Sequence, residues 1–336
     1  MNQRDLSIDY LRFIGISMII LAHVAAPFSL VQFRSFDVPL MIFISGLTSS
    51  RKTFPNYFRY IWTRSKRLLV PVYIFLTALF IIMYLLRSSG VIMENLSLKT
   101  VVHTYLLLEG IGYVWIIRVF LLIMILTPFL VRFEMTCKSN VLYGLACLAL
   151  MFLNDAILLL QFPLPGGKLV NIFVGEFAMY LIGYVPLFML GLRMRYSDEK
   201  VCRRYIWGVS VCAASGVLYY LANNGLPLAP SAYKYPPQFY FLVYGSLVSV
   251  ILWCFRDKIA NLIDFLKLTS AVTFIGQNTI WIYLWHIPFV MLFKETIDNW
   301  FLRYAVIYGC ALAVFKLQTL IVRRVAHPNV KKYFLG

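Results

Sequence analysis

Apolar residues in this chain gather into long runs, and short segments between the runs contain most of the charged side chains. A run of about 20 apolar residues is long enough for a helix to cross the hydrocarbon core of a membrane, which is about 30 Å thick. The second run is too short to cross comfortably, so we expect it to be tilted, broken at Pro39 or continued by the next segment. Ten spans are predicted: residues 10–31, 36–50, 68–87, 113–131, 141–160, 173–192, 205–222, 238–255, 271–293 and 301–322.

Composition supports the same class of protein. Hydrophobic residues make up 61% of the 336 positions and charged residues only 13%, which lies outside the range of soluble globular proteins. Nothing in the chain has the alternating ten-residue pattern of an outer-membrane barrel. We therefore predict an all-α, polytopic membrane protein that forms one domain over residues 1–336.

The net charge of +17 is explained by where the cations fall along the chain. With the N-terminus inside, the inward loops contain Arg51, Lys52, Arg59, Arg64, Lys66, Arg67, Arg132, Lys138, Arg193, Arg195, Lys200, Arg203, Arg204, Arg256, Lys258, Lys267, Arg323, Arg324, Lys331 and Lys332. The outward loops contain Arg34, Arg87, Lys99, Lys168, Lys234, Lys294 and Arg303. This asymmetry predicts that both termini are cytoplasmic, and the charge does not require a nucleic-acid partner.

The first apolar run contains two candidate catalytic residues, Arg12 and His23. Their spacing of eleven residues would place both on one helix face, roughly 16 Å apart along the axis. Asp9, one turn before Arg12, could orient its guanidinium group. An ionisable ring at membrane depth is costly and indicates a chemical site. The alternatives are a structural histidine with an interfacial arginine, or a secretory signal in this run.

Residues 51–67 predict a basic amphipathic helix that lies in the cytoplasmic interface. Arg64 and Arg67 are three residues apart and therefore point the same way, with Lys66 between them. Such a group could bind phosphates, and it would equally serve as a membrane anchor.

Other ionisable residues within the apolar runs fall at two heights. Lys316 lies toward the cytoplasm, whereas Arg118, Glu176 and His286 lie toward the outside. Long side chains near helix ends can extend to the interface, so a structural role is the alternative for Lys316, Arg118 and Glu176. The chain has no metal-ligand spacing, no phosphate-binding loop and no dinucleotide fingerprint, so no metal site is predicted.

Several motifs together resemble the bacterial membrane acyltransferase family 3. The opening block contains Arg12, then His23 after ten residues, then a proline and a Phe-Ile-Ser-Gly element at residues 43–46. One departure is Met41, because many relatives have an aromatic residue there. The remaining matching segments are the basic loop 64–71, the tryptophan-led span from 113 to 128, and the late elements 276–279 and 283–288.

The resemblance implies transfer of an acetyl group from cytoplasmic acetyl-CoA to a hydroxyl of a cell-surface or lipid-linked glycan, in the bacterial inner membrane. Arg12 and His23 match the family's essential pair, and Arg64 and Arg67 match its second arginine pair. Because the chain stops after the tenth span, it resembles the stand-alone branch without an esterase-like domain. His23 would act as a general base or would carry the acyl group itself.

Further roles are suggested for residues around this pair. Ser45 could donate to the thioester oxygen or stabilise helix packing. His286 could bind the acceptor, hold His23 in its working tautomer, or serve only as an interfacial residue. Arg118, Glu176 and Trp115 are further substrate-binding candidates.

Two other classes of membrane protein remain as alternatives. A flippase or proton-coupled transporter for lipid-linked sugars could use His23, Glu176 and His286 as a proton relay. A glycan polymerase would carry long, arginine-rich outward loops, which this chain lacks. A transporter is therefore the main alternative to an acyltransferase.

Overall fold

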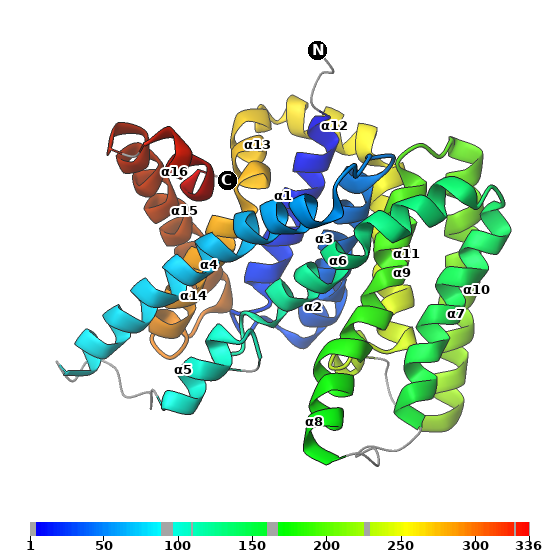
Figure 1. Cartoon of the computed structure of the whole chain (residues 1–336), viewed down its shortest axis with the longest axis horizontal. Helices are drawn as coiled ribbons and strands as arrows, with labels where there is room; N and C mark the ends of the chain where they lie inside the picture. The colour runs from blue at the N-terminus through cyan, green and yellow to red at the C-terminus, as the bar shows by residue number, and fades with distance from the viewer. Residues whose placement is uncertain are drawn as a thin grey trace. The chain divides into compact units, whose positions relative to one another are not determined.

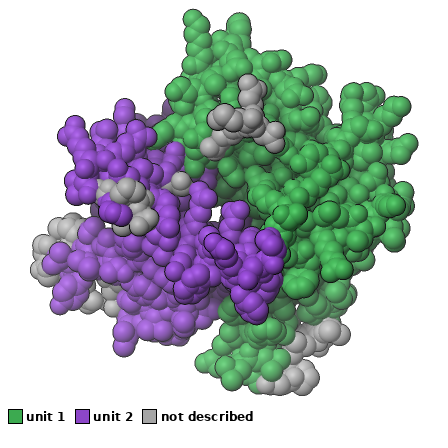
Figure 2. Space-filling model, turned by 45° about the horizontal axis from the view of Figure 1, so that its top comes forward, with its two compact units in different colours: residues 1–22, 26–54, 122–277 green, residues 23–25, 55–121, 278–336 purple. Residues whose placement is uncertain are grey.

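The computed structural model describes residues 5–88, 97–108, 110–159, 167–224, 229–325 and 327–335. Within these ranges the chain is helical and has no strand, so the all-α prediction is confirmed (Figure 1). The chain divides into two compact units (Figure 2). Unit 1 consists of residues 1–22, 26–54 and 122–277, and unit 2 of residues 23–25, 55–121 and 278–336.

Most helices of the N-terminal and central regions belong to unit 1. They are α1 (Leu6–Leu21), α2 (Phe28–Phe33), η1 (Arg34–Phe36), α3 (Asp37–Ser49), α7 (Asn140–Leu159), α8 (Gly167–Ile172), the π-helix η2 (Phe173–Ala178), α9 (Met179–Met194), α10 (Glu199–Asn224), η3 (Pro230–Tyr233), α11 (Phe239–Cys254), α12 (Arg256–Phe265) and α13 (Thr269–Gln277).

Unit 2 contains the long helix α4, the short helix α5 and the C-terminal helices. Their bounds are α4 (Tyr57–Ser88), α5 (Leu98–Tyr105), α14 (Thr279–Phe293), α15 (Trp300–Val325) and α16 (Pro328–Phe334). The helix α6 (Trp115–Thr136) begins in unit 2 and continues into unit 1.

The first predicted span, 10–31, is not one helix. Helix α1 begins at an Asp5 N-cap and ends at Leu21, and a turn follows over residues 22–25. Ala25 has a left-handed backbone (φ +49°) and Pro27 cannot continue a helix, so the chain leaves the helical path here. The prediction that Arg12 and His23 project from one helix face is therefore wrong, because His23 lies in the turn.

The short second span is continued on its N-terminal side. Helix α2 and η1 lead directly into α3, and the apolar segment Phe28–Ser49 is long enough to cross a membrane. Pro39 lies in the first turn of α3, where its missing N–H has no intrahelical partner to lose. The helix is consequently not broken at Pro39.

The basic segment 51–67 does not form a separate interfacial helix. Residues 51–56 are not helical, and α4 then runs without interruption from Tyr57 into the apolar part of the third span. Pro71 lies inside this helix. The basic residues from Arg59 to Arg67 thus form the N-terminal turns of α4, a helix long enough to cross a membrane.

The described part of the structure contains fewer helices of membrane-spanning length than the ten spans that the apolar runs predict. Within the described residues, six helices are long and apolar enough to cross a membrane, and a seventh is obtained if α11 and α12, bent by 62°, form one span. The predicted span 271–293 is divided at Asn278 into α13 and α14. The chain is a multi-pass membrane protein, while the count of ten and the cytoplasmic termini stay predictions.

Close backbone contact holds the centre of unit 1 together. Helices α3 and α9 cross at Gly46 and Gly191, and a Cβ atom on either glycine would collide with a carbonyl oxygen of the other helix. In the same way, α13 approaches the backbone of Asp9 in α1 at Gly276. Small residues that let helix backbones touch are typical of membrane helix packing.

Two cations that were expected in outward loops are buried in unit 1. Arg34 Nη1 lies 2.6 Å from Asp37 Oδ2, and Lys234 Nζ lies 3.6 Å from Asp37 Oδ1. All three side chains are at most 8% exposed. Buried charges need partners to offset their desolvation, and this ion network supplies them.

Candidate functional site

His23 lies beside a second histidine in unit 2. Its Nδ1 atom is 3.1 Å from Nε2 of His286, and the ring centroids are 5.1 Å apart. His286, on α14, is fully buried, whereas His23 is only partly buried. One ring is therefore accessible for chemistry and the other can act only through it.

Hydrogen bonding fixes the tautomers of this pair. His286 Nδ1 lies within hydrogen-bond distance of the Tyr283 carbonyl, which can only accept, so Nδ1 carries the hydrogen. Nε2 of the neutral His286 ring must then accept, and His23 Nδ1 donates to it. The second nitrogen of His23, Nε2, is consequently the one that has the lone pair and can accept a proton.

The ring of Tyr113 contacts both histidines within unit 2. Tyr113 meets His23 edge to face at 5.1 Å between centroids, and it is nearly perpendicular to His286 at 6.2 Å. The Tyr283 hydroxyl donates to the Tyr113 carbonyl, which joins α14 to the segment before α6. These contacts restrict the rotation of both imidazoles.

A buried arginine holds the turn that contains His23. Arg303, in the first turn of α15, donates from Nη1 to the Val24 carbonyl at 3.1 Å. Its Nε and Nη2 both donate to the Ile297 carbonyl, at 2.8 and 2.5 Å. The planar guanidinium thus joins the residue after His23 to the loop before α15.

Arg12 and Asp9 lie together on α1 in unit 1, as predicted. Arg12 Nη1 is 3.3 Å from Asp9 Oδ1, and Gln277 Nε2 is 3.3 Å from Asp9 Oδ2. Asp9 is 1% exposed and Arg12 28% exposed. The buried carboxylate therefore orients a guanidinium whose outer part reaches the surface.

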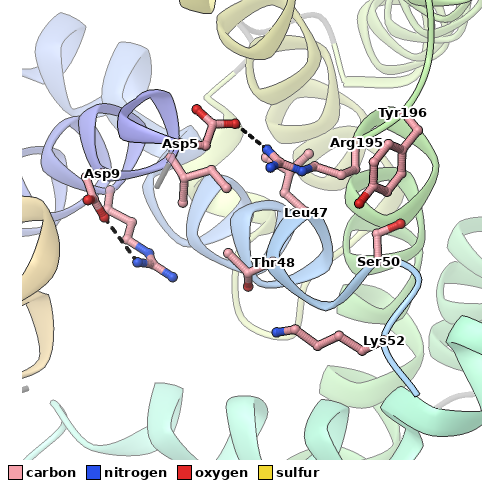
Figure 3. A pocket seen from close by; sticks show the side chains of 10 residues that line it. Asp5, Asp9, Leu47, Thr48, Ser50, Lys52, Arg195 and Tyr196 are labelled. Atoms are coloured by element: carbon pink, nitrogen blue, oxygen red, sulfur yellow. Dashed lines mark hydrogen bonds and ion pairs between the residues drawn. The ribbon is translucent and has the colours of Figure 1, made fainter. Parts of the chain in front are cut away.

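Arg12 lines a pocket of about 310 Å³ at the end of unit 1 where α1 begins and α3 and α9 end (Figure 3). Arg195 Nη1 lies 2.5 Å from Asp5 Oδ2 at this pocket, and the two side chains point toward one another. Burial raises the pKa of Asp5, but the hydrogen bond and charge of Arg195 outweigh it and leave the pKa below its usual value. The lining residues are Asp5, Ile8, Asp9, Arg12, Leu47, Thr48, Ser50, Lys52, Arg195 and Tyr196.

The predicted phosphate-binding cations lie on the exposed N-terminal turns of α4. Arg64, Lys66 and Arg67 are all exposed, and Lys66 Nζ lies 4.2 Å above the centre of the Trp62 ring. Their positions leave the head groups accessible to an anion. Their assignment to phosphate binding stays a prediction.

The remaining site candidates have structural contacts. Ser45 donates to the Met41 carbonyl of its own helix at 3.1 Å, a contact that favours the packing role. Arg118 is buried in α6 and donates to the Leu107 carbonyl at 3.1 Å. Glu176 lies in the π-helix η2, and Trp115 is the first residue of α6. Catalytic or binding roles for these residues stay predictions.

Sequence reasoning missed Gln277 and Arg303, and it gave Lys52 and Arg195 no role beyond the charge asymmetry. Gln277 stands in the Gly-Gln-Asn-Thr element that was singled out, so its motif was a usable signal. Arg303 was expected in an outward loop, and no local pattern indicates that it reaches the turn after His23. Pairings across nearly 280 residues leave no periodic trace.

No group of three or more histidine, cysteine, aspartate or glutamate residues with metal-binding geometry occurs in the part of the chain that the structure describes. A comparison with known protein families finds that the family model described as an acyltransferase domain matches residues 5–316. No curated protein and no solved structure matches the chain.

Proposed function

Because the chain belongs to acyltransferase family 3, we propose that this membrane acyltransferase moves an acetyl group from acetyl-CoA to a hydroxyl of a cell-surface or lipid-linked glycan. The proposal places it in the bacterial cytoplasmic membrane. The observation that carries it is the histidine pair of unit 2, in which a fully buried ring holds an accessible one in a single tautomer. An arrangement of this kind suits proton transfer at a reacting hydroxyl.

The reaction uses the lone pair on Nε2 of His23. This nitrogen takes the proton from the sugar hydroxyl while the hydroxyl oxygen attacks the carbonyl carbon of the thioester. The carbon–sulfur bond then breaks, and the departing thiolate of coenzyme A takes the proton back from His23. The products are the acetylated glycan and free coenzyme A, and His23 returns to its starting state.

His286 contributes by stabilising the charged form of His23. When Nε2 takes a proton, the ring becomes an imidazolium that still donates from Nδ1 to His286. That hydrogen bond becomes charge-assisted and therefore stronger during the reaction. The gain occurs only as charge develops, which is the condition for a contact to raise the rate.

Cationic side chains would bind the phosphates of the donor. Arg64 and Arg67 have accessible guanidinium groups on α4, and the planar fork of arginine matches phosphate oxygens. Arg12 provides a further oriented guanidinium in unit 1.

The test is acceptor-dependent release of coenzyme A from acetyl-CoA by the purified chain in lipid discs. We expect His23→Ala to lower the rate by about a hundredfold or more, and His103→Ala, a histidine on α5 with no role in the proposal, to leave it unchanged. Thermal unfolding of each variant checks that it is folded. Absence of release with every acceptor tried, together with no binding of acetyl-CoA, would contradict the proposal and favour a transporter for lipid-linked sugars.

A further inference from the structure

The pocket of unit 1 brings together three cations and two carboxylates. Arg12, Lys52 and Arg195 line it with Asp5 and Asp9, which gives a net charge of +1 from these five side chains. They come from three helix ends that are far apart in the sequence (Figure 3). A surplus of positive charge in a concave site favours a small anion as its ligand.

Two of the cations are preoriented by their carboxylates. Asp9 lies 3.3 Å from Arg12, and Asp5 lies 2.5 Å from Arg195. Arg195 also stands 5.7 Å from the centre of the Trp253 ring. A guanidinium has five N–H donors in a rigid fork, so Arg195 has donors beyond the one that faces Asp5.

The third cation is placed by a turn. Helix α3 ends at Ser49, and Arg51 then adopts a left-handed backbone (φ +54°), with its guanidinium 4.0 Å from the centre of the Tyr196 ring. The left-handed residue ends the helical path, and Lys52 then extends along the pocket beneath Thr48 (Figure 3). The exposed lysine therefore adds a charge at the accessible side of the site.

We propose that this pocket is a binding site for a phosphate monoester, with Lys52 and Arg195 as its main ligands and Arg12 beside them. Its volume of about 310 Å³ is at the lower end of ligand pockets, which fits a nucleotide-sized group rather than a whole coenzyme. The phosphate end of an acyl-CoA donor is such a group, and this identification rests on the proposed function. The existence of the anion site rests on the pocket alone.

Asp5 limits the affinity of this site. Its carboxylate occupies Arg195 and adds a negative charge that a phosphate must face. Asn is as good an N-cap as Asp, so Asp5→Asn should keep the start of α1 intact while it removes that charge. A gain of phosphate affinity in this variant cannot be explained by loss of folding.

The experiment measures binding of adenosine 3′,5′-bisphosphate to the full chain in discs of zwitterionic lipid, by calorimetry. We expect Lys52→Ala and Arg195→Gln each to raise the Kd about tenfold, the effect of one lost charge-assisted hydrogen bond. Asp5→Asn should lower the Kd severalfold. Arg203→Gln, which removes an exposed cation on α10 that pairs with Glu199, is the matched control and should leave the Kd unchanged.

Failure of this inference can be told apart from failure of the proposed function. His23→Ala should bind the bisphosphate as the wild type does, so binding without any thioester turnover would support the anion site and contradict only the acyl transfer. Equal Kd values for the wild type, Lys52→Ala and Asp5→Asn would overturn the site.

A second set of discs, which contains phosphatidylglycerol, tests whether a lipid phosphate can occupy the site. If that lipid raises the Kd of the bisphosphate in the wild type, the lipid phosphate and the bisphosphate compete for one anion site, which supports it; an unchanged Kd shows that the site takes the soluble phosphate monoester in preference to a lipid head group. If the zwitterionic discs give no binding at all, the proposed site is overturned, and the donor assignment with it.

Discussion

Replacement of His286 tests whether a buried histidine controls the chemistry of an accessible one. His286 has no exposed surface, and its Nε2 lies 3.1 Å from Nδ1 of His23, so a hydrogen bond connects it to the accessible ring. His286→Leu removes the acceptor, whereas His286→Gln keeps a carbonyl oxygen that can accept from His23. Both replacements have similar bulk, so the comparison isolates the hydrogen bond from the cavity that alanine would leave.

The expected loss follows from the strength of that bond. A hydrogen bond to a charged group contributes about 1.5–3 kcal/mol, and each 1.4 kcal/mol corresponds to a factor of ten in rate. His286→Leu should therefore lower kcat about ten- to hundredfold, and His286→Gln should recover most of it. The KM for acetyl-CoA should stay within about twofold, because neither histidine is proposed to contact the phosphates.

The assay is steady-state release of coenzyme A in lipid discs, with the unfolding temperature of each variant as a check. The reasoning is refuted if His286→Leu keeps kcat within about threefold of the wild type. It is equally refuted if His286→Gln is no more active than His286→Leu while both unfold at the temperature of the wild type. A rise in KM with unchanged kcat would instead assign His286 to substrate binding.

Two further predictions concern stability and pH. Gly46→Ala should lower the free energy of unfolding by about 1–3 kcal/mol, because its Cβ would collide with the Phe188 carbonyl. Gly208→Ala, whose Cβ would meet no atom of the described residues within 4 Å, should be neutral or stabilising. Thermal unfolding in detergent compares the two variants, and equal shifts would contradict the packing of α3 against α9. Asp5→Asn should cost about 1 kcal/mol of unfolding free energy at pH 7. Since the pKa of Asp5 is lowered in the folded chain, its contribution is present above the unfolded pKa of about 4 and is lost as pH falls through the folded pKa. The two unfolding temperatures should therefore converge as the solution is acidified below about pH 4, and a difference that does not shrink on acidification would contradict the ion pair.

Local patterns along the chain predicted several long helices well but not the breaks within other apolar runs. Apolar runs identified the positions of α6, α7 and α15 to within a few residues, because burial in lipid requires long apolar helices. The end of α1 at Leu21 was missed, since the turn after it depends on Arg303, which is remote in sequence. A run of hydrophobic residues carries no information about such a contact.

Part of the candidate site was also predictable. Asp9 and Arg12 are three residues apart on a helix, and the structure confirms that they pair. His23 and His286 were each singled out within apolar runs, and holding His23 in its working tautomer was one of three roles considered for His286. The fold selects this contact by bringing together two rings that are 263 residues apart. The cation pocket was hidden for the same reason, because Lys52 and Arg195 looked like ordinary members of inward loops.

The two proposals assign binding and chemistry to different residues of the opening motif. Arg12 belongs to the cation pocket of unit 1, and His23 belongs to the histidine pair of unit 2. The two residues are eleven positions apart, yet the helix that holds the first has ended before the second. Substitutions at Lys52 or Arg195 should consequently raise the KM for the donor with little change in kcat, and substitutions at His286 should do the reverse. Such a separation would give the motif two distinct parts, a cation fixed on the helix and a histidine whose orientation the helix does not determine.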